Sequence, residues 1–245
     1  MHVLEHPGGW TPVLCVHGFC QSSAYWAPTL NRLDVRGLAV DLPGFGDSAG
    51  DPGPYTMEAY ADRLAAELDA RGIERITLVG GSMGGTVAQH FALRHPARLS
   101  RLLLVATGGA TRDSAAGLAR ANEIEAAPWD DALITSIVAG FFRTPPGTWA
   151  VDSRRIAGRA SQHAAVEAAR SNALSRTIDR AAEIRAPTLI IQGRYDRART
   201  PEDGAALRDR IAEARLELLE HSGHTPQLEE PSAFHALALP FLRGG

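Results

Sequence analysis

A serine set between small residues is the group in this chain whose surroundings most clearly suggest chemistry. Ser82 lies in the segment GGSMGG at 80–85, directly after an apolar run at 76–79 and before a helical pattern. This is a G-x-S-x-G motif, in which strand and helix approach so closely that Gly80 and Gly84 must lack side chains. Amides at the start of the helix would favour negative charge beside the serine. We predict that Ser82 is a nucleophile rather than an idle serine in a glycine-rich turn.

A serine hydroxyl becomes a good nucleophile when a base removes its proton, and the base needs an acid to orient it. Two candidates follow the serine in the order acid, then base. Asp196 comes after one apolar run, where it could equally be a turn-forming aspartate. His224 comes after the next run, and the flanking Gly223 favours it over His221. We predict a triad of Ser82, Asp196 and His224.

An acyl-transfer intermediate on the serine would carry an oxyanion, which two backbone N–H groups must bind. We expect one donor from Met83, the residue after the serine, and the other from Phe19, in the loop after an apolar run at 13–16. In the same loop His17 has a structural interpretation, in which its ring nitrogens tie the loop. Cys20 is a candidate for the pocket wall, and no base accompanies it to make it a second nucleophile.

Two residues near these loops have structural interpretations. Asp41 begins the segment DLPGFGDS at 41–48, whose proline and glycines indicate a fixed turn. We expect its carboxylate to bond its own loop rather than to serve the triad. Trp26 is expected in the core below the Phe19 loop, because large aromatic residues are mostly buried.

Aromatic residues further along the chain suggest a largely apolar substrate pocket. The candidate pocket residues are Cys20, Trp129, Phe141, Phe142 and Trp149. Arginines in the same region could meet a substrate carboxylate or the acidic surface of a carrier protein, although a solvated helix face is the simpler explanation. These arginines are Arg143, Arg154, Arg155 and Arg159.

The sequence around these candidate residues predicts strands that alternate with helices and would position them. Short apolar runs bounded by glycine, proline or aspartate are typical of parallel strands buried on both faces. They lie at 13–16, 37–40, 76–79, 102–105, 188–191 and 216–219, with helical patterns at 57–70, 86–94 and 232–242. This alternation predicts an α/β fold with a doubly wound, mostly parallel sheet and active groups at the carboxyl ends of its strands.

The alternation breaks once, between the runs at 102–105 and 188–191. The intervening segment is rich in alanine, has a composition typical of helices and is interrupted by prolines. Because long excursions from compact domains are usually functional, we interpret residues 111–171 as a helical lid inserted over the site, with extra packing as the alternative. Residues 1–110 and 172–245 would then form one core domain.

The composition excludes several other classes of function. The chain has 245 residues, 44% of them hydrophobic, and a formal net charge of −3, which fits a globular protein without the basic surface of a nucleic-acid or membrane binder. All 25 basic residues are arginine, so a lysine Schiff base and a P-loop lysine are excluded. Cys15 and Cys20 have neither disulfide-framework nor zinc-site spacing.

The N-terminal residues lack the pattern of a signal peptide, and no apolar stretch is long enough to span a membrane. We therefore expect a cytoplasmic protein that acts on a small molecule, with no cofactor and no metal. The sequence does not indicate an oligomeric state.

Taken together, these motifs resemble the α/β-hydrolase family over nearly the whole chain. The resemblance rests on HGF at 17–19, DLPGFGDS at 41–48, GGSMGG at 80–85, GRYD at 193–196 and GH at 223–224. It implies the α/β-hydrolase fold, with Ser82 as nucleophile, Asp196 as acid and His224 as base. Because little chain precedes the first predicted strand, the protein is similar to compact carboxylesterase-like members that have lost most of the leading antiparallel hairpin.

Neighbouring residues bear on the subfamily. The chain resembles the carbon–carbon bond hydrolases of aromatic degradation at 82–85 and 193–197, yet it has Gly81 where they commonly carry asparagine and Thr225 where they commonly carry tryptophan. It lacks the arginines that the menaquinone-pathway synthase places around these motifs. Haloalkane dehalogenases and epoxide hydrolases are excluded, because they use an aspartate nucleophile where this chain has Ser82.

The sequence thus predicts a serine hydrolase that cleaves a carboxylic ester, or a thioester, through an acyl-enzyme. The same triad could instead cleave a carbon–carbon bond or perform a biosynthetic lyase or cyclase step, and a perhydrolase reaction is a further variant. A non-catalytic small-molecule receptor on the same scaffold is the alternative from another class.

Overall fold

The structure, a computed structural model, describes residues 1–111 and 113–244. Its centre is a seven-stranded sheet with the order β1-β3-β2-β4-β5-β6-β7. Strand β1 pairs antiparallel with β3, and the other pairings are parallel. The strands are β1 (Val3–His6), β2 (Gly9–Val16), β3 (Val35–Val40), β4 (Ile76–Gly81), β5 (Leu99–Val105), β6 (Thr188–Gly193) and β7 (Ala214–Leu219).

The six predicted apolar runs all fall inside parallel strands, which confirms the doubly wound α/β sheet. The exception is β1, an antiparallel edge strand that the sequence did not predict. Its residues are only partly buried, and Leu4 is 36% exposed. A short edge strand of this kind lacks the continuous apolar run by which a central strand is recognised.

Helices cover both faces of the sheet, because successive strand residues point to opposite sides. Val13 and Cys15 face one core, which α1 (Ala27–Leu30) and α10 (Pro231–Arg243) complete. Leu14 and Val16 face the other core. The helices that contribute to that second core include α2 (Met57–Ala70), α3 (Met83–Arg94) and α8 (Pro201–Arg208). The helix α9 (Pro226–Glu229) follows β7.

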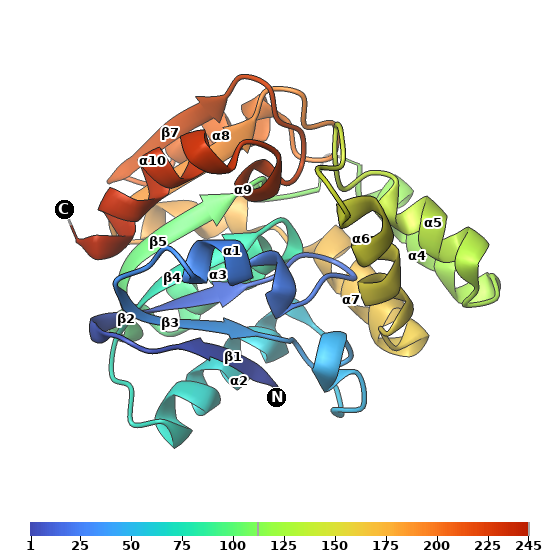
Figure 1. Ribbon diagram of the computed structural model, residues 1–245, viewed down its shortest axis with the longest axis horizontal. Helices are drawn as coiled ribbons and strands as arrows, with labels where there is room; N and C mark the ends of the chain where they lie inside the picture. The colour runs from blue at the N-terminus through green and yellow to red at the C-terminus, as the bar shows by residue number, and fades with distance from the viewer. Residues whose placement is uncertain (112, 245) are drawn as a thin grey trace.

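Between β5 and β6, where the sequence departs from its alternation, the described residues form four α-helices, followed by a 3-10 helix (Thr177–Glu183). The four α-helices are α4 (Ser114–Ala126), α5 (Asp131–Val138), α6 (Trp149–Gly158) and α7 (Gln162–Leu174). Figure 1 shows them grouped beyond the ends toward which the parallel strands point. Helix α7 continues to Leu174, past the boundary expected at 171.

Side chains cap the starts of α4, α5 and α7, whereas α6 has no such cap. The side chain of Asp113 accepts a hydrogen bond from the amide of Ala116 at 2.9 Å, and that of Asp130 accepts one from Leu133 at 3.0 Å. Such caps satisfy amides that a helix start leaves without a partner. Within the described ranges, no helix has both the length and the apolar character needed to cross a bilayer.

Candidate active site

Ser82 occupies the tight turn between β4 and α3. Its φ of 52° is a backbone conformation that a residue with a side chain adopts only under strain. A Cβ atom at Gly80 would lie 2.4 Å from the carbonyl oxygen of Gly84, and one at Gly84 would lie 2.4 Å from that of His17. The predicted need for glycine on both sides of the serine therefore has a direct steric cause.

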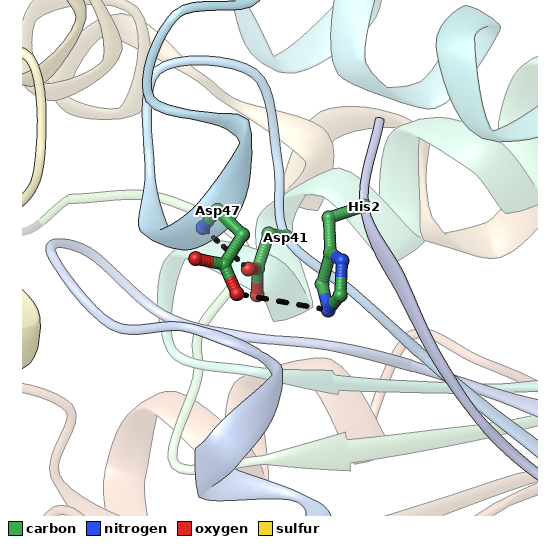
Figure 2. Close-up of side chains that lie close together, drawn as sticks. All are labelled: His2, Asp41 and Asp47. Atoms are coloured by element: carbon green, nitrogen blue, oxygen red, sulfur yellow. Dashed lines mark hydrogen bonds and ion pairs between the residues drawn. The ribbon is translucent and has the colours of Figure 1, made fainter.

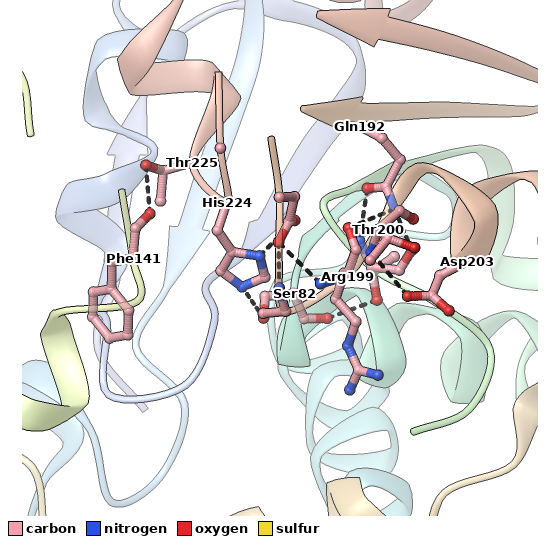
Figure 3. A network of polar contacts seen from close by, with 12 residues as sticks. Ser82, Phe141, Gln192, Arg199, Thr200, Asp203, His224 and Thr225 are labelled. Carbon is pink, nitrogen blue, oxygen red and sulfur yellow. Dashed lines mark hydrogen bonds and ion pairs between the residues drawn. The ribbon is translucent and has the colours of Figure 1, made fainter. Parts of the chain in front are cut away.

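The predicted triad residues meet at the carboxyl ends of three strands. The Ser82 hydroxyl lies 2.8 Å from Nε2 of His224, and Nδ1 of His224 lies 2.7 Å from Oδ2 of Asp196. Figure 3 shows the His224 ring directed at Ser82. The Asp196 side chain is fully buried. The competing His221 is exposed, and its hydrogen bonds run through its backbone, whose amide donates to Glu230 and whose carbonyl accepts from Arg143.

The second oxygen of Asp196 fixes the orientation of the carboxylate. Oδ1 accepts hydrogen bonds from the amides of Ala198, at 2.8 Å, and Arg199, at 2.9 Å. Oδ2 is thereby directed at the imidazole, so Nδ1 of His224 must donate to it. In the neutral ring Nε2 is then an acceptor, and it can receive the proton of Ser82.

Thr107 and Gln192, which were not among the predicted site residues, form a network of hydrogen bonds around the triad. Thr107 donates its hydroxyl proton to the Ser82 carbonyl at 2.9 Å, and the buried amide of Gln192 bonds both the N–H and the C=O of Thr107 at 3.1 Å. Gln192 also donates to the carbonyl of Thr200, in the loop that follows Asp196, at 3.1 Å. The only sequence signal was a polar residue at the end of the apolar strand β6.

Met83 and Phe19, the two residues expected to supply oxyanion donors, lie at the start of α3 and in the loop after β2. Met83 is the first residue of α3, whose first intrahelical bonds are donated by Gly85 and Thr86 to the Ser82 carbonyl. No acceptor for the amides of Met83 and Phe19 occurs among the residues that the structure describes. Both amides are therefore available to a ligand.

His17 has the structural role expected for it. Its Nε2 accepts a hydrogen bond from the Leu42 amide at 3.0 Å, which requires the ring proton to be on Nδ1, 2.7 Å from the Gly18 carbonyl. Burial lowers the pKa of His17, and the negative charge of Asp41 opposes that effect. The neutral ring joins the Phe19 loop to the loop after β3.

Asp41 serves loop structure, as expected, and also belongs to a cluster with His2 and Asp47 (Figure 2). Its two oxygens accept the amide protons of Ser23, at 2.6 Å, and Asp47, at 2.7 Å. Asp47 also forms an ion pair with Arg159. These contacts leave the cluster short of the free oxygen ligands that a cation needs.

Only one of the five candidate pocket residues lines the cleft beside His224. Phe142 does so, in a cleft of about 430 Å³. Cys20 is fully buried in the core, where burial raises the pKa of its thiol. Phe141 and Trp149 pack on Tyr25, with ring centroids 6.3 and 4.8 Å from the centroid of the Tyr25 ring. The indole N–H of Trp129 donates to the Gly158 carbonyl at 3.3 Å, and Trp26 lies in the core, 1% exposed.

Glu229 is a further residue that the sequence analysis missed. Its Oε1 accepts the amide protons of Gly223 and Thr225, on either side of His224, at 3.1 and 3.0 Å. Its Oε2 accepts those of Arg143 and Thr144, in the connection between α5 and α6, at 2.8 and 3.4 Å. One carboxylate thus joins the histidine loop to the helical insertion through hydrogen bonds.

Known proteins share this chain's architecture along its whole length. A 2-hydroxy-6-oxo-2,4-heptadienoate hydrolase of Pseudomonas putida is 30% identical over 98% of this chain and 91% of the relative. A hydrolase from Pseudomonas aeruginosa is 27% identical, with a TM-score of 0.91 over 99% of this chain and 94% of that one. An esterase from Thermogutta terrifontis is 27% identical, with a TM-score of 0.87 over 98% and 93% of the two chains.

The family model for the alpha/beta hydrolase fold matches residues 11–231, from the strand β2 to the first residue of α10. That span includes the serine turn, the aspartate loop and the histidine loop described above. This chain belongs to the α/β-hydrolase family and is a hydrolase.

Proposed function

We propose that this chain is a serine hydrolase that cleaves a carboxylic ester, with a thioester as a variant of the same chemistry, through an acyl-enzyme. The observation that carries the proposal is the line from Ser82 Oγ through His224 to Asp196, with hydrogen-bond distances of 2.8 and 2.7 Å. A nucleophile, a base and an orienting acid need this arrangement.

In the acylation half of the reaction, Ser82 Oγ attacks the ester carbonyl carbon and its proton passes to Nε2 of His224. The amides of Phe19 and Met83 bind the resulting oxyanion, and Asp196 stabilises the imidazolium. When the intermediate collapses, the alcohol oxygen leaves with the proton from Nε2, and the acyl group stays on Ser82.

Deacylation repeats these steps with water as the nucleophile. Water gives a proton to Nε2 of His224 and attacks the acyl-enzyme carbonyl carbon. The second tetrahedral intermediate then expels Ser82, which regains the proton, and the carboxylic acid departs. The esterase from Thermogutta terrifontis among the similar structures supports an ester as the substrate.

A second candidate, carbon–carbon bond hydrolysis, is favoured by the relative from Pseudomonas putida. The compound in that relative's name holds no ester bond, so hydrolysis beside its 6-oxo group breaks a carbon–carbon bond. Ser82 and the two amides could serve that ketone as they serve an ester. The reaction would additionally need a proton delivered to the departing carbon.

We also propose that the segment from α4 to α7 acts as a lid over this site. Its connection between α5 and α6 contacts the histidine loop directly, since the hydroxyl of Thr225 donates to the Phe141 carbonyl at 2.9 Å. Figure 3 shows this contact beside the His224 ring.

The test is kcat/KM for p-nitrophenyl esters from acetyl to dodecanoyl, with Ser82→Ala as control, alongside hydrolysis of 2-hydroxy-6-oxo-2,4-heptadienoate. Ester turnover that Ser82→Ala abolishes, with an optimum at one chain length, is the expected result. If every ester is inert while the dienoate is cleaved in a Ser82-dependent way, the second candidate replaces the first. If Ser82→Ala retains full activity, both candidates are wrong.

A further inference from the structure

The cleft beside His224 has an unusual charge for a protein with a formal net charge of −3. Its wall consists of Ala139, Gly140, Phe142, Arg143, Tyr195, Arg197, Gly223 and His224. Two of these residues carry guanidinium groups, and none is acidic. The cleft therefore presents two positive charges next to the proposed general base.

Arg143 is held firmly in this wall. Its guanidinium lies 3.6 Å from the centroid of the Tyr195 ring and donates to the His221 carbonyl at 3.1 Å. Its backbone amide donates to Glu229 at 2.8 Å. A cation that is already ordered loses little conformational entropy when it binds a ligand, so Arg143 is prepared to bind an anion.

Arg197 differs from its neighbours in the aspartate loop. Arg194 forms a two-point ion pair with Glu220, at 2.5 and 2.7 Å. For the side chain of Arg197, in contrast, none of the residues at 1–111 and 113–244 provides a hydrogen bond or an ion pair. Arg197 lines the cleft and follows Asp196 directly in the sequence, and the planar donors of a guanidinium match the two oxygens of a carboxylate.

We propose that the cleft binds a carboxylate of the substrate through Arg143 and Arg197, so that the preferred ester carries a carboxylate away from the bond that is cleaved. The proposal rests on the proposed ester hydrolysis and names its substrate class. His224 connects the cleft with the reacting bond, because this residue lines the cleft and its Nε2 lies 2.8 Å from Ser82 Oγ. Arg143 and Arg197 then determine specificity, and they take no part in proton transfer.

The test compares esters that differ only by a carboxylate in place of a methyl group. Monomethyl glutarate and methyl pentanoate place the difference on the acyl side, and 4-acetoxybutanoate and butyl acetate place it on the alcohol side. We expect the wild type to prefer the anionic ester in at least one pair. Arg197→Gln should lower kcat/KM for that anionic ester by about tenfold or more, the usual loss for a hydrogen bond to a charged group, and leave its neutral counterpart within about twofold.

Arg185→Gln is the matched control, since it also removes one positive charge. Arg185 is exposed and precedes β6, whereas Asp196 and Arg197 follow the carboxyl end of that strand. It should leave the ratio of anionic to neutral ester hydrolysis unchanged. The proposal is overturned if the wild type shows no preference in either pair, or if Arg185→Gln and Arg197→Gln change the ratio equally.

A measurement of glutarate binding tests the carboxylate site independently of the proposed ester hydrolysis. Glutarate titrated calorimetrically into Ser82→Ala should bind, and the double variant Ser82→Ala with Arg197→Gln should bind it at least about tenfold more weakly. If all four esters are inert but this binding difference is found, the carboxylate site stands and ester hydrolysis fails. If the esters are hydrolysed but glutarate binds both proteins equally, the carboxylate site fails and ester hydrolysis stands.

Discussion

Single residues decide which proton the proposed triad can move. Asp196 presents one oxygen to two backbone amides and the other to His224. The imidazole consequently keeps its proton on Nδ1 and offers the lone pair of Nε2 to Ser82. The same geometry determines what an amide side chain would do in place of the carboxylate.

Asp196→Asn should retain the fold and lose activity. The asparagine oxygen would take the place of Oδ1, because the amides of Ala198 and Arg199 need an acceptor there. Its NH₂ group would then donate to Nδ1 of His224 and force the ring proton onto Nε2, where it blocks proton transfer from Ser82. We expect kcat to fall by about 10⁴-fold.

The measurement is ester turnover together with thermal unfolding of both proteins. A midpoint within a few degrees of the wild type would show that the loss is chemical. Activity within about tenfold of the wild type would contradict the assigned tautomer, since a wrong tautomer costs far more than that.

Elements bring these residues together through contacts that are distant in sequence. The carboxylate of Glu229, in α9, takes two amides from the histidine loop and two from the connection between α5 and α6. At Gly223 a Cβ atom would lie 2.8 Å from the Arg143 nitrogen, so the two segments approach as closely as glycine allows. The position of the insertion and the position of His224 are therefore coupled.

Glu229→Gln tests this coupling. A glutamine can accept from one pair of amides only, because its NH₂ group faces the other pair with donors alone. We expect unfolding free energy to fall by about 1–3 kcal/mol, the cost of leaving such donors unsatisfied, and kcat to fall as His224 loses its fixed position.

Denaturant unfolding and ester kinetics measure both effects. Glu183→Gln, which alters an exposed ion pair with Arg180, is the control and should change neither quantity appreciably. Wild-type stability and kcat in Glu229→Gln would show that the hydrogen bonds of the Glu229 carboxylate have no part in positioning the site.

Local patterns explain why some of this arrangement could be predicted and some could not. Buried parallel strands are continuous apolar runs, and the turn around Ser82 needs glycine for steric reasons, so both are visible in the sequence. The roles of Gln192 and Glu229 depend on hydrogen bonds to segments far along the chain. Most of the aromatic residues expected in the pocket pack inside the core or the insertion instead, because residue type alone cannot tell a core aromatic residue from a ligand-binding one.

Over the whole molecule, several histidines are held neutral by burial. Burial lowers the pKa of His17, His90 and His235. The unfolded chain binds protons on these rings below its pKa near 6.5, and the folded protein does not. Above about pH 6.5 these rings are neutral in both states, and the free energy of unfolding keeps its full value. As the pH falls below about 6.5, protons bind to the unfolded chain and the free energy of unfolding declines.

His17→Gln should make this decline shallower. The variant loses the bonds to Leu42 and Gly18, so it is less stable at pH 7, but it has one fewer buried ring to protonate on unfolding. Its slope of unfolding free energy against pH, below about pH 6.5, should be smaller than the wild-type slope by up to about 1.4 kcal/mol per pH unit.

Urea unfolding at several pH values between 7.5 and 5 measures the two slopes. His221→Gln, at an exposed position, serves as the control and should keep the wild-type slope. Equal slopes for His17→Gln and the wild type would contradict a neutral buried His17.

If Ser82 carries the acyl group during turnover, the acyl-enzyme can be trapped on that residue. The wild type would be mixed rapidly with a p-nitrophenyl ester, quenched in acid and digested for peptide mass spectrometry, with Ser82→Ala treated identically. We expect an acyl adduct on Ser82 in the wild type and neither adduct nor turnover in Ser82→Ala. Undiminished ester turnover by Ser82→Ala, with no adduct on Ser82 in the wild type, would contradict the proposed acyl-enzyme.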